Sequence, residues 1–147
     1  MKSKDKILIL DFGSQYTQLI ARRVREIGVF SEVKPSSISA EKIIEMNPSG
    51  IILSGGPETV TASSSQKVDK ILLESKIPIL GICYGMQTIA NELGGSVINS
   101  DIREFGHAKI SNFKQSVLFY NMSFVSDSLD VWMSHGDKVK VMPKNFE

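Results

Sequence analysis

Ile77-Pro78-Ile79-Leu80-Gly81-Ile82-Cys83-Tyr84-Gly85-Met86-Gln87 is the stretch of sequence that decides the fold. The apolar run over residues 77–82 is short and predicts a buried β-strand. A helix is predicted directly after it, because apolar residues recur at helical spacing and two glycines then end the segment. The apolar residues on the buried face of this predicted helix are Met86, Ile89, Ala90 and Leu93, and the glycines that end it are Gly94 and Gly95. A strand that runs straight into a helix is the basic unit of an α/β fold.

The same strand-then-helix pattern occurs repeatedly before this stretch. The predicted strands cover residues 6–11, 30–33 and 50–53, and the predicted helices cover residues 16–27, 40–44 and 63–72. The last of these helices is predicted to begin with a capping box formed by Ser63 and Gln66. Units of this length imply right-handed crossovers. We therefore predict an α/β fold with a doubly wound, mainly parallel, flavodoxin-like sheet that carries helices on both faces.

The pattern changes after residue 95, where long helices no longer separate the apolar segments. Short strands are predicted over residues 97–98, 108–110, 116–119, 131–133 and 139–142. Trp132 and Met133 are candidates for the core of this region. These segments predict a small antiparallel or mixed region within a single domain that covers residues 1–147. Because residues 145–147 follow a proline with no closing element, we expect this domain to be incomplete.

Composition excludes several classes of protein. The 147 residues carry a formal net charge of +1, so no strong field favours nucleic acid or a membrane surface. No apolar run approaches the roughly 20 residues that cross a bilayer. The sequence contains no metal-binding Cys/His cluster and no Walker A motif, and we expect neither a metal nor a cofactor in this chain. A single cysteine suits a reducing, cytoplasmic location.

Cys83 lies in a Gly-x-Cys-x-Gly motif between the predicted strand and helix, which is the layout of a nucleophile elbow. Glycines on both sides allow the backbone to turn sharply without Cβ clashes. The N-terminus of the following helix favours a thiolate, so we expect a lowered pKa for Cys83. The backbone N–H of Tyr84 is then available to an oxyanion that forms next to the sulfur.

Ser54-Gly55-Gly56-Pro57 follows the preceding strand, at the edge of a parallel sheet where ligands bind. Taken alone, this segment is better explained as a plain tight turn. Paired with the cysteine elbow, it favours a functional interpretation in which the Gly56 N–H is the second oxyanion donor. The two segments together predict acyl transfer through a thioester.

Thioester chemistry also needs a base, and the sequence contains only His107 and His135. Asp137 is two residues after His135, so on a strand both side chains would face the same side. A polar turn in a loop explains this pair better than a catalytic role does. His107 has no carboxylate close after it, and spacing alone leaves both histidines open as candidates.

Five segments of this chain resemble the glutaminase domains of the GMP synthase family, a branch of the class I glutamine amidotransferases. The resemblance runs essentially the whole length of the chain. The elbow and the Ser-Gly-Gly-Pro turn are shared by class I amidotransferases in general, whereas the first and last segments point to the GMP synthase branch. The matching segments cover residues 7–23, 51–58, 81–87, 103–108 and 131–137.

The resemblance implies that Cys83 attacks the side-chain amide of L-glutamine and that ammonia leaves. It also implies that the backbone N–H groups of Gly56 and Tyr84 stabilise the oxyanion. Residues implied to hold the glutamine are Gly55, Gln87, Ser134, His135, Gly136 and Asp137. The family passes ammonia to an ATP pyrophosphatase (synthetase) domain or subunit, which uses ATP and Mg²⁺ to convert XMP into GMP. A homodimer through a C-terminal region of the longer protein is also implied.

The chain departs from the family pattern in one respect. The family places its catalytic His and Glu in a Phe-His-Pro-Glu-type segment, which this sequence does not contain. The resemblance also places His135 in the substrate loop, which argues against it as the base. We therefore expect a C-terminally truncated glutaminase domain without its synthetase domain, nearly inactive alone, because proton transfer contributes about 10²–10⁴-fold to such reactions.

Three other interpretations remain. The chain could belong to another class I amidotransferase, such as one that acts in the synthesis of anthranilate, CTP or carbamoyl phosphate. It could be a non-catalytic docking module that retains the elbow, which the missing His–Glu segment favours. It could also be a redox-sensing thiol, since an activated Cys83 would react with oxidants.

Overall fold

The computed structural model describes residues 5–111, 116–120, 122 and 128–146, and within these ranges the side chains of residues 100–105 and 135 are left out. The chain divides into two compact units. The first consists of Met1–Asn99 together with Asp137–Glu147, and the second is Ser100–Gly136.

The first unit is built on a four-stranded sheet with the strand order β2-β1-β3-β4. The strands are β1 (Lys6–Asp11), β2 (Phe30–Pro35), β3 (Gly50–Leu53) and β4 (Ile79–Gly81). Every pairing in this sheet is parallel, with Leu10 opposite Leu53 and Leu53 opposite Gly81. This confirms the predicted doubly wound, parallel sheet, whose order begins like that of flavodoxin.

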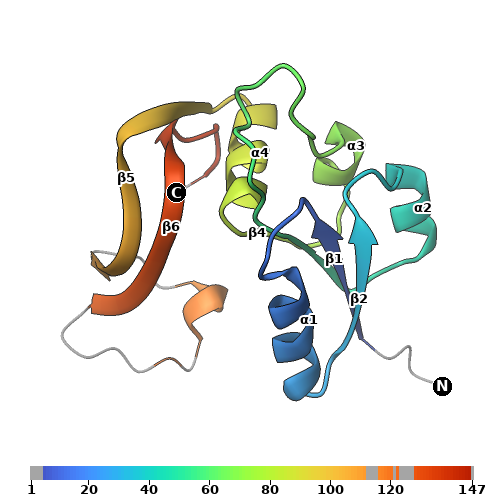
Figure 1. Ribbon diagram of the computed structural model, residues 1–147. Helices are drawn as coiled ribbons and strands as arrows, with labels where there is room; N and C mark the ends of the chain where they lie inside the picture. The colour runs from blue at the N-terminus through green and yellow to red at the C-terminus, as the bar shows by residue number, and fades with distance from the viewer. Residues whose placement is uncertain (1–4, 112–115, 121, 123–127, 147) are drawn as a thin grey trace. The chain divides into compact units, whose positions relative to one another are not determined.

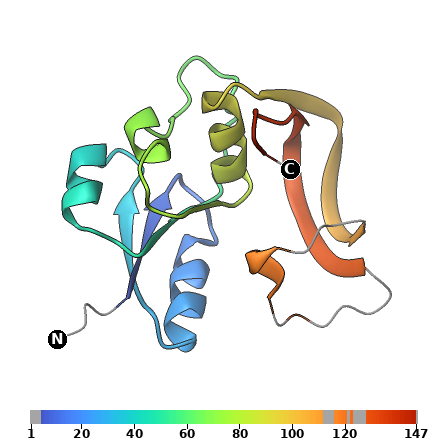
Figure 2. The same ribbon diagram turned by 180° about the vertical axis from the view of Figure 1, so that it is seen from behind.

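Helices cover both faces of this sheet, as the alternation of buried residues requires. α1 (Thr17–Glu26) lies on one side, and α2 (Ala40–Glu45), α3 (Lys70–Leu73) and α4 (Tyr84–Glu92) lie on the other (Figures 1 and 2). Leu8 and Leu10 of β1 are buried in one core with residues of all three of these helices. Ile9, which points to the opposite face, is fully buried together with Ala21 of α1.

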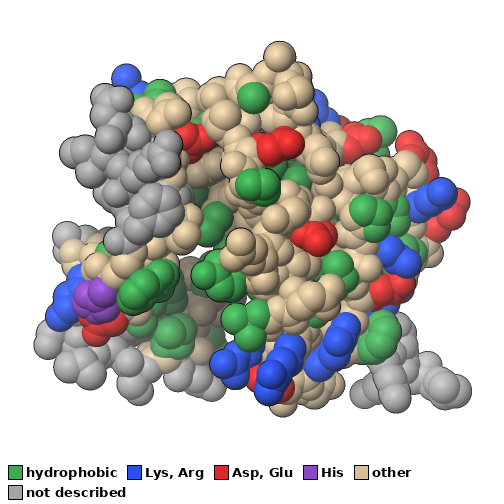
Figure 3. Space-filling model, in the orientation of Figure 1, with side chains coloured by type: hydrophobic (Ala, Val, Ile, Leu, Met, Phe, Trp, Pro, Cys, Tyr) green, Lys and Arg blue, Asp and Glu red, His purple; other side chains and the backbone are tan. Residues whose placement is uncertain are grey.

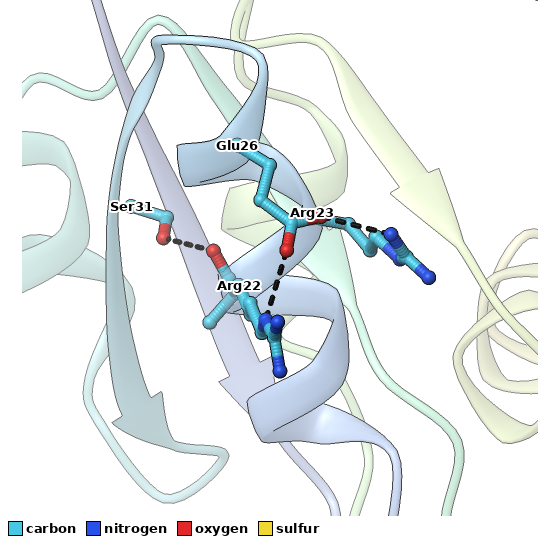
Figure 4. A network of polar contacts seen from close by, with 5 residues as sticks. Arg22, Arg23, Glu26 and Ser31 are labelled. Carbon is cyan, nitrogen blue, oxygen red and sulfur yellow. Dashed lines mark hydrogen bonds and ion pairs between the residues drawn. The ribbon is translucent and has the colours of Figure 1, made fainter.

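The outer surface of α1 carries a small polar network. Glu26 accepts hydrogen bonds from Arg22 at 2.8 Å and from Arg23 at 2.9 Å (Figure 4). A separate, buried bond joins α1 to β2, because the Ser31 hydroxyl donates to the Ala21 carbonyl at 2.9 Å. The arginines are exposed, so solvent screens these ion pairs and they contribute little to the stability of the fold. Acidic and basic side chains both occur over the coloured surface in Figure 3, in line with the near-neutral composition.

Two details of the helices differ from the sequence-based expectations. α3 begins at Lys70 and is capped by Asp69, whose carboxylate accepts from the Ile71 N–H at 2.9 Å, so the capping box at Ser63 was wrong. Residues 63–69 are irregular, and the backbone N–H groups of Gln66 and Val68 donate to the side chains of Glu58 and Thr88 instead of forming helical turns. Met86 is 45% exposed, so it does not belong to the buried face of α4.

The region after residue 95 consists of long strands rather than several short ones. β5 (Ser96–Ser111) pairs with β6 (Ser128–Val141) in a two-stranded sheet whose strands run in opposite directions (Figure 1). Backbone hydrogen bonds continue through the polar residues between the predicted segments, which apolar patterning alone does not reveal. The antiparallel region was thus predicted correctly.

Two predictions within this region were wrong. Residues 117–119 form a short 3₁₀ helix, η1 (Val117–Phe119), instead of a strand, because the Ser116 hydroxyl accepts from the Leu118 N–H at 3.2 Å and stabilises a turn. Trp132 is 76% exposed and therefore is not a core residue. A two-stranded ribbon has few residues to cover an outward-facing side chain.

Candidate active site at the carboxyl edge of the sheet

Three loops meet at one edge of the parallel sheet. The loops after β1, β3 and β4 leave the sheet at the same level, because Leu10, Leu53 and Gly81 are paired in register. The carboxyl edge of such a sheet is where ligands bind in α/β folds. This arrangement brings residues 12–14, residues 54–57 and Cys83 together from distant parts of the sequence.

Cys83 occupies the turn between β4 and α4 in a strained conformation. Its φ is 50° and its ψ is −111°, an unusual combination for a residue with a side chain. Such backbone strain costs about 1–3 kcal/mol and persists only where the surroundings impose it. The strained turn is the conformation that a nucleophile elbow requires, and it displays the side chain at the start of α4.

The two glycines of the motif make this turn sterically feasible. A Cβ on Gly81 would lie 2.6 Å from the backbone nitrogen of Met86. A Cβ on Gly85 would overlap the backbone carbonyl of Leu53 and lie 2.6 Å from its Cβ. Hydrogen bonds of 3.0 Å from the Gly85 N–H to the Ser54 carbonyl and 2.9 Å from the Ile82 N–H to the Leu53 carbonyl tie the elbow to β3. The elbow is therefore held directly against the end of the neighbouring strand.

The turn after β3 lies against the elbow. A Cβ on Gly55 would be 3.5 Å from the Cβ of Cys83, and a Cβ on Gly56 would be 3.4 Å from the ring of Tyr84. Ser54 is fully buried, and its hydroxyl accepts from the Phe12 N–H at 3.1 Å and donates to the Gly55 carbonyl at 2.8 Å. These bonds fix the shape of the turn beside Cys83.

The backbone N–H groups of Gly56 and Tyr84 have no hydrogen-bond acceptor among the residues that the structure describes. Free N–H groups beside a nucleophile are what an oxyanion hole requires. Tyr84 itself is firmly placed, because its ring packs on Phe12 with centroids 5.3 Å apart and its hydroxyl donates to the Gln66 carbonyl. The Tyr84 N–H is consequently held in position by a buried aromatic contact.

The loop after β1 adds a residue that sequence analysis did not select. The Ser14 hydroxyl would lie 3.5 Å from a Cβ on Gly55, the same distance as the Cys83 Cβ. One oxygen of Asp11 shapes this loop by accepting from the Gly13 N–H at 2.9 Å, the Ser14 N–H at 3.3 Å and the Thr17 hydroxyl at 2.7 Å. The signal in the sequence was an Asp at a strand end followed by Gly and Ser, which is typical of a structured polar loop.

Burial raises the pKa of the Cys83 thiol, which is half-buried. The expected lowering of this pKa by the start of α4 is therefore contradicted. The physical reason is desolvation, because removing water from the sulfur disfavours the charged thiolate. At neutral pH the resting side chain is a thiol, and its proton must be removed before it can act as a nucleophile.

This pKa direction makes a testable prediction for alkylation by iodoacetamide. For free cysteine, with a pKa of about 8.5, the thiolate fraction begins to level off near that pH. A raised pKa means that the thiolate fraction of Cys83 still grows about tenfold per pH unit there. The rate constant at Cys83 should therefore keep rising above pH 8.5, and at pH 7 it should be lower than that of free cysteine. A plateau reached below pH 8 would show that the helix terminus outweighs desolvation.

Of the residues predicted to hold a substrate, Gln87 and Asp137 contact each other. The side-chain amide of Gln87 donates to the Asp137 backbone carbonyl at 3.0 Å, and both residues are buried. Ser134 and Gly136 belong to the second unit. The side chain of His135 lies outside the described residues. The roles of these three residues in binding remain predictions.

His107 has a carboxylate partner that sequence spacing did not reveal. Its Nε2 lies 2.9 Å from a carboxylate oxygen of Asp130, and both side chains are exposed in the second unit. Asp130 is 23 residues later in the chain and is brought close by the pairing of β5 with β6. A role for His107 as base is still a prediction.

Among the described residues, no group of three or more His, Cys, Asp or Glu side chains could hold a metal ion. Across the same part of the chain, every helix is too short or too polar to cross a membrane.

The sequence and the fold match one protein family. The family model described as glutamine amidotransferase class-I matches residues 8–147, and the chain belongs to this family. Among curated proteins, it is 57% identical to a GMP synthase [glutamine-hydrolyzing] of Tolumonas auensis, over 97% of this chain. It is 56% identical to the protein of the same name from Teredinibacter turnerae, over 96% of this chain. The chain spans 28% of the length of each of these relatives.

Solved structures agree with the fold. A Thermoplasma acidophilum protein, described as a putative subunit of GMP synthase, superposes with a TM-score of 0.81 at 29% identity, and the match covers 100% of this chain and 72% of that one. A glutamine amidotransferase of Thermotoga maritima superposes with a TM-score of 0.69 at 21% identity, over 95% of this chain and 64% of that one. The second likeness concerns the fold alone.

Proposed function

We propose that this chain hydrolyses glutamine to glutamate and ammonia as part of a GMP synthase. The observation that carries the proposal is a strained Cys83 beside two backbone N–H groups, of Gly56 and Tyr84, which have no acceptor in the described part of the chain. The names of the curated relatives support the choice of glutamine as substrate.

The proposed reaction has two steps. Cys83 loses its proton to a base, and its sulfur forms a bond to the amide carbon of glutamine while the carbonyl electron pair moves to the oxygen. The N–H groups of Gly56 and Tyr84 hold this oxyanion, and the C–N bond then breaks as the nitrogen takes the proton and leaves as ammonia. Water attacks the resulting thioester, which releases glutamate and restores the thiol. The net reaction consumes one water for each glutamine.

The later steps belong to the longer protein. We propose that the ammonia is delivered to an ATP pyrophosphatase domain or subunit, where ATP and Mg²⁺ convert XMP to GMP. In this proposal the chain is one part of an amidotransferase domain, in a cytoplasmic enzyme that forms dimers through other regions.

The proposal is tested by labelling Cys83 with a chloroketone analogue of glutamine. Intact mass should show a single adduct, which excess glutamine prevents and which Cys83→Ala abolishes. Iodoacetamide should label the same residue. L-glutamine should slow this labelling much more than acetate or D-glutamine does. An adduct that L-glutamine does not block would refute a glutamine site and would favour a redox-active thiol, whereas no adduct would favour a docking module.

The GMP synthase branch is tested with the longer protein. Glutamine-dependent amination should occur with XMP as the acceptor and not with chorismate or UTP. Amination of either of the other acceptors would assign the chain to a different amidotransferase.

A further inference from the structure

The Ser54 hydroxyl is a fully buried group that controls the direction of one backbone carbonyl. Its Oγ accepts a hydrogen bond from the Phe12 N–H at 3.1 Å. The single hydroxyl proton is left for the Gly55 carbonyl, to which it donates at 2.8 Å. In the described part of the chain, no other donor bonds to this carbonyl. The direction of the Gly55 carbonyl therefore depends on one side-chain hydroxyl.

The Gly55 carbonyl and the Gly56 N–H belong to the same peptide group. A trans peptide group is planar, and its carbonyl and its N–H point in opposite directions. The hydroxyl that holds the carbonyl toward Ser54 thus also sets the direction of the Gly56 N–H. That N–H has no acceptor among the described residues, so no bond of its own fixes where it points.

Glycine on both sides of this peptide makes a reversed orientation accessible. A peptide group reverses when ψ of the residue before it and φ of the residue after it change together, and glycine resists such changes least. Close packing requires glycine here, because a Cβ on Gly56 would lie 2.7 Å from the Phe12 carbonyl. The side chain that would restrict rotation is therefore absent, and the Ser54 hydroxyl supplies the restriction instead.

We propose that Ser54 is a positioning residue that selects the orientation of the Gly55–Gly56 peptide in which the Gly56 N–H serves the oxyanion. This inference rests on the proposed function. In the reversed orientation a carbonyl oxygen would take the place of the N–H and would repel the negative charge of the oxyanion. The Ser54 hydroxyl is occupied by Phe12 and Gly55, so it acts through the backbone and not on the substrate.

Ser54→Ala tests this role in the longer protein, because it removes one oxygen atom and leaves the backbone sequence of the turn intact. The kcat for ammonia release from L-glutamine should fall about 10- to 100-fold, less than the roughly 10²–10³-fold cost of losing an oxyanion donor outright. KM should change less than about threefold, because an interaction made only in the transition state lowers kcat and kcat/KM together. An increase in KM with kcat retained would overturn the inference, since it would place Ser54 in substrate binding.

Ser31→Ala is the matched control. Ser31 of β2 is 1% exposed, and its hydroxyl also donates to a backbone carbonyl, that of Ala21, at 2.9 Å. It pairs with Ile7, near the start of β1, and so lies away from the carboxyl edge of the sheet. Both variants should lower the melting temperature, but Ser31→Ala should keep kcat within about twofold. Equal losses of kcat would contradict the positioning role, because general destabilisation would explain them.

Ser54→Thr and Ser54→Val separate the hydroxyl from the packing of this buried position. Threonine and valine have nearly the same volume, so overpacking affects both variants alike, and only threonine keeps the donor. The kcat of Ser54→Thr should exceed that of Ser54→Val by at least about fivefold, the effect of one buried hydrogen bond. Equal kcat values in the two variants would show that the hydroxyl has no role in the reaction.

The orientation of the peptide is measured in this chain without catalysis. In a sample with isotopically labelled glycine, the nuclear Overhauser effect between the Gly55 α-protons and the Gly56 amide proton depends on ψ of Gly55. It should change in Ser54→Ala and stay the same in Ser31→Ala. An unchanged effect in Ser54→Ala would overturn the inference even if kcat falls. Absence of glutamine hydrolysis by the unaltered longer protein would instead refute the proposed function.

Discussion

Replacing Cys83 with alanine should lower glutamine hydrolysis by the protein at least about 10⁴-fold, because removing a catalytic nucleophile eliminates the covalent route altogether. The residual rate would come only from the oxyanion donors of Gly56 and Tyr84 acting on direct attack by water. Ammonia release from L-glutamine, measured in the full-length protein, checks this expectation.

The same variant should fold normally. Cys83 is half-buried, and alanine removes only its sulfur atom without altering the backbone. The expected change in the free energy of unfolding is below about 1 kcal/mol. Hydrolysis within tenfold of the unaltered protein, in a variant with an unchanged melting temperature, would mean that Cys83 is not the nucleophile.

Gly85→Ala should destabilise the first unit by more than about 3 kcal/mol, the upper end of the usual cost of overpacking. The added Cβ would overlap the Leu53 carbonyl oxygen and lie 2.8 Å from its carbon. These are backbone atoms of β3, in the middle of the sheet, so they cannot move as a flexible side chain would. Urea denaturation followed by circular dichroism measures the loss directly.

Gly94→Ala is the control for this substitution, because Gly94 lies at the other end of α4. Gly94 has a φ of 89°, but a Cβ there would meet nothing within 4 Å. Only the conformational cost of positive φ applies, which is about 1 kcal/mol. A loss at Gly85 no larger than the loss at Gly94 would contradict the close contact between the elbow and β3.

The sequence predicted the elements that have a strong local signal. The apolar run over residues 6–11 forms β1 with the predicted bounds, and residues 50–53 form β3. Glycines at positions 81 and 85 predicted the elbow, because a sharp turn between a strand and a helix restricts which residues fit. Capping was harder to predict, since Ser63 and Asp69 both precede apolar residues and only the packed structure selects Asp69.

Contacts between distant segments could not be predicted from local patterns. The Ser14 hydroxyl lies beside Gly55 because the parallel register aligns the ends of β1 and β3. The Gln87–Asp137 hydrogen bond spans 50 residues, and the His107–Asp130 pair spans 23. Each depends on how strands pair and helices pack, which no spacing within the sequence encodes.

The sequence by itself determined the fold class and the position of the cysteine elbow, because apolar periodicity and glycine placement act over a few residues. The tertiary structure alone decided the protonation of Cys83. The start of α4 was expected to favour a thiolate, but burial of the sulfur raises the thiol pKa, because desolvation disfavours the charged form. Burial depends on which loops surround a residue, so this property arises only when the chain has folded.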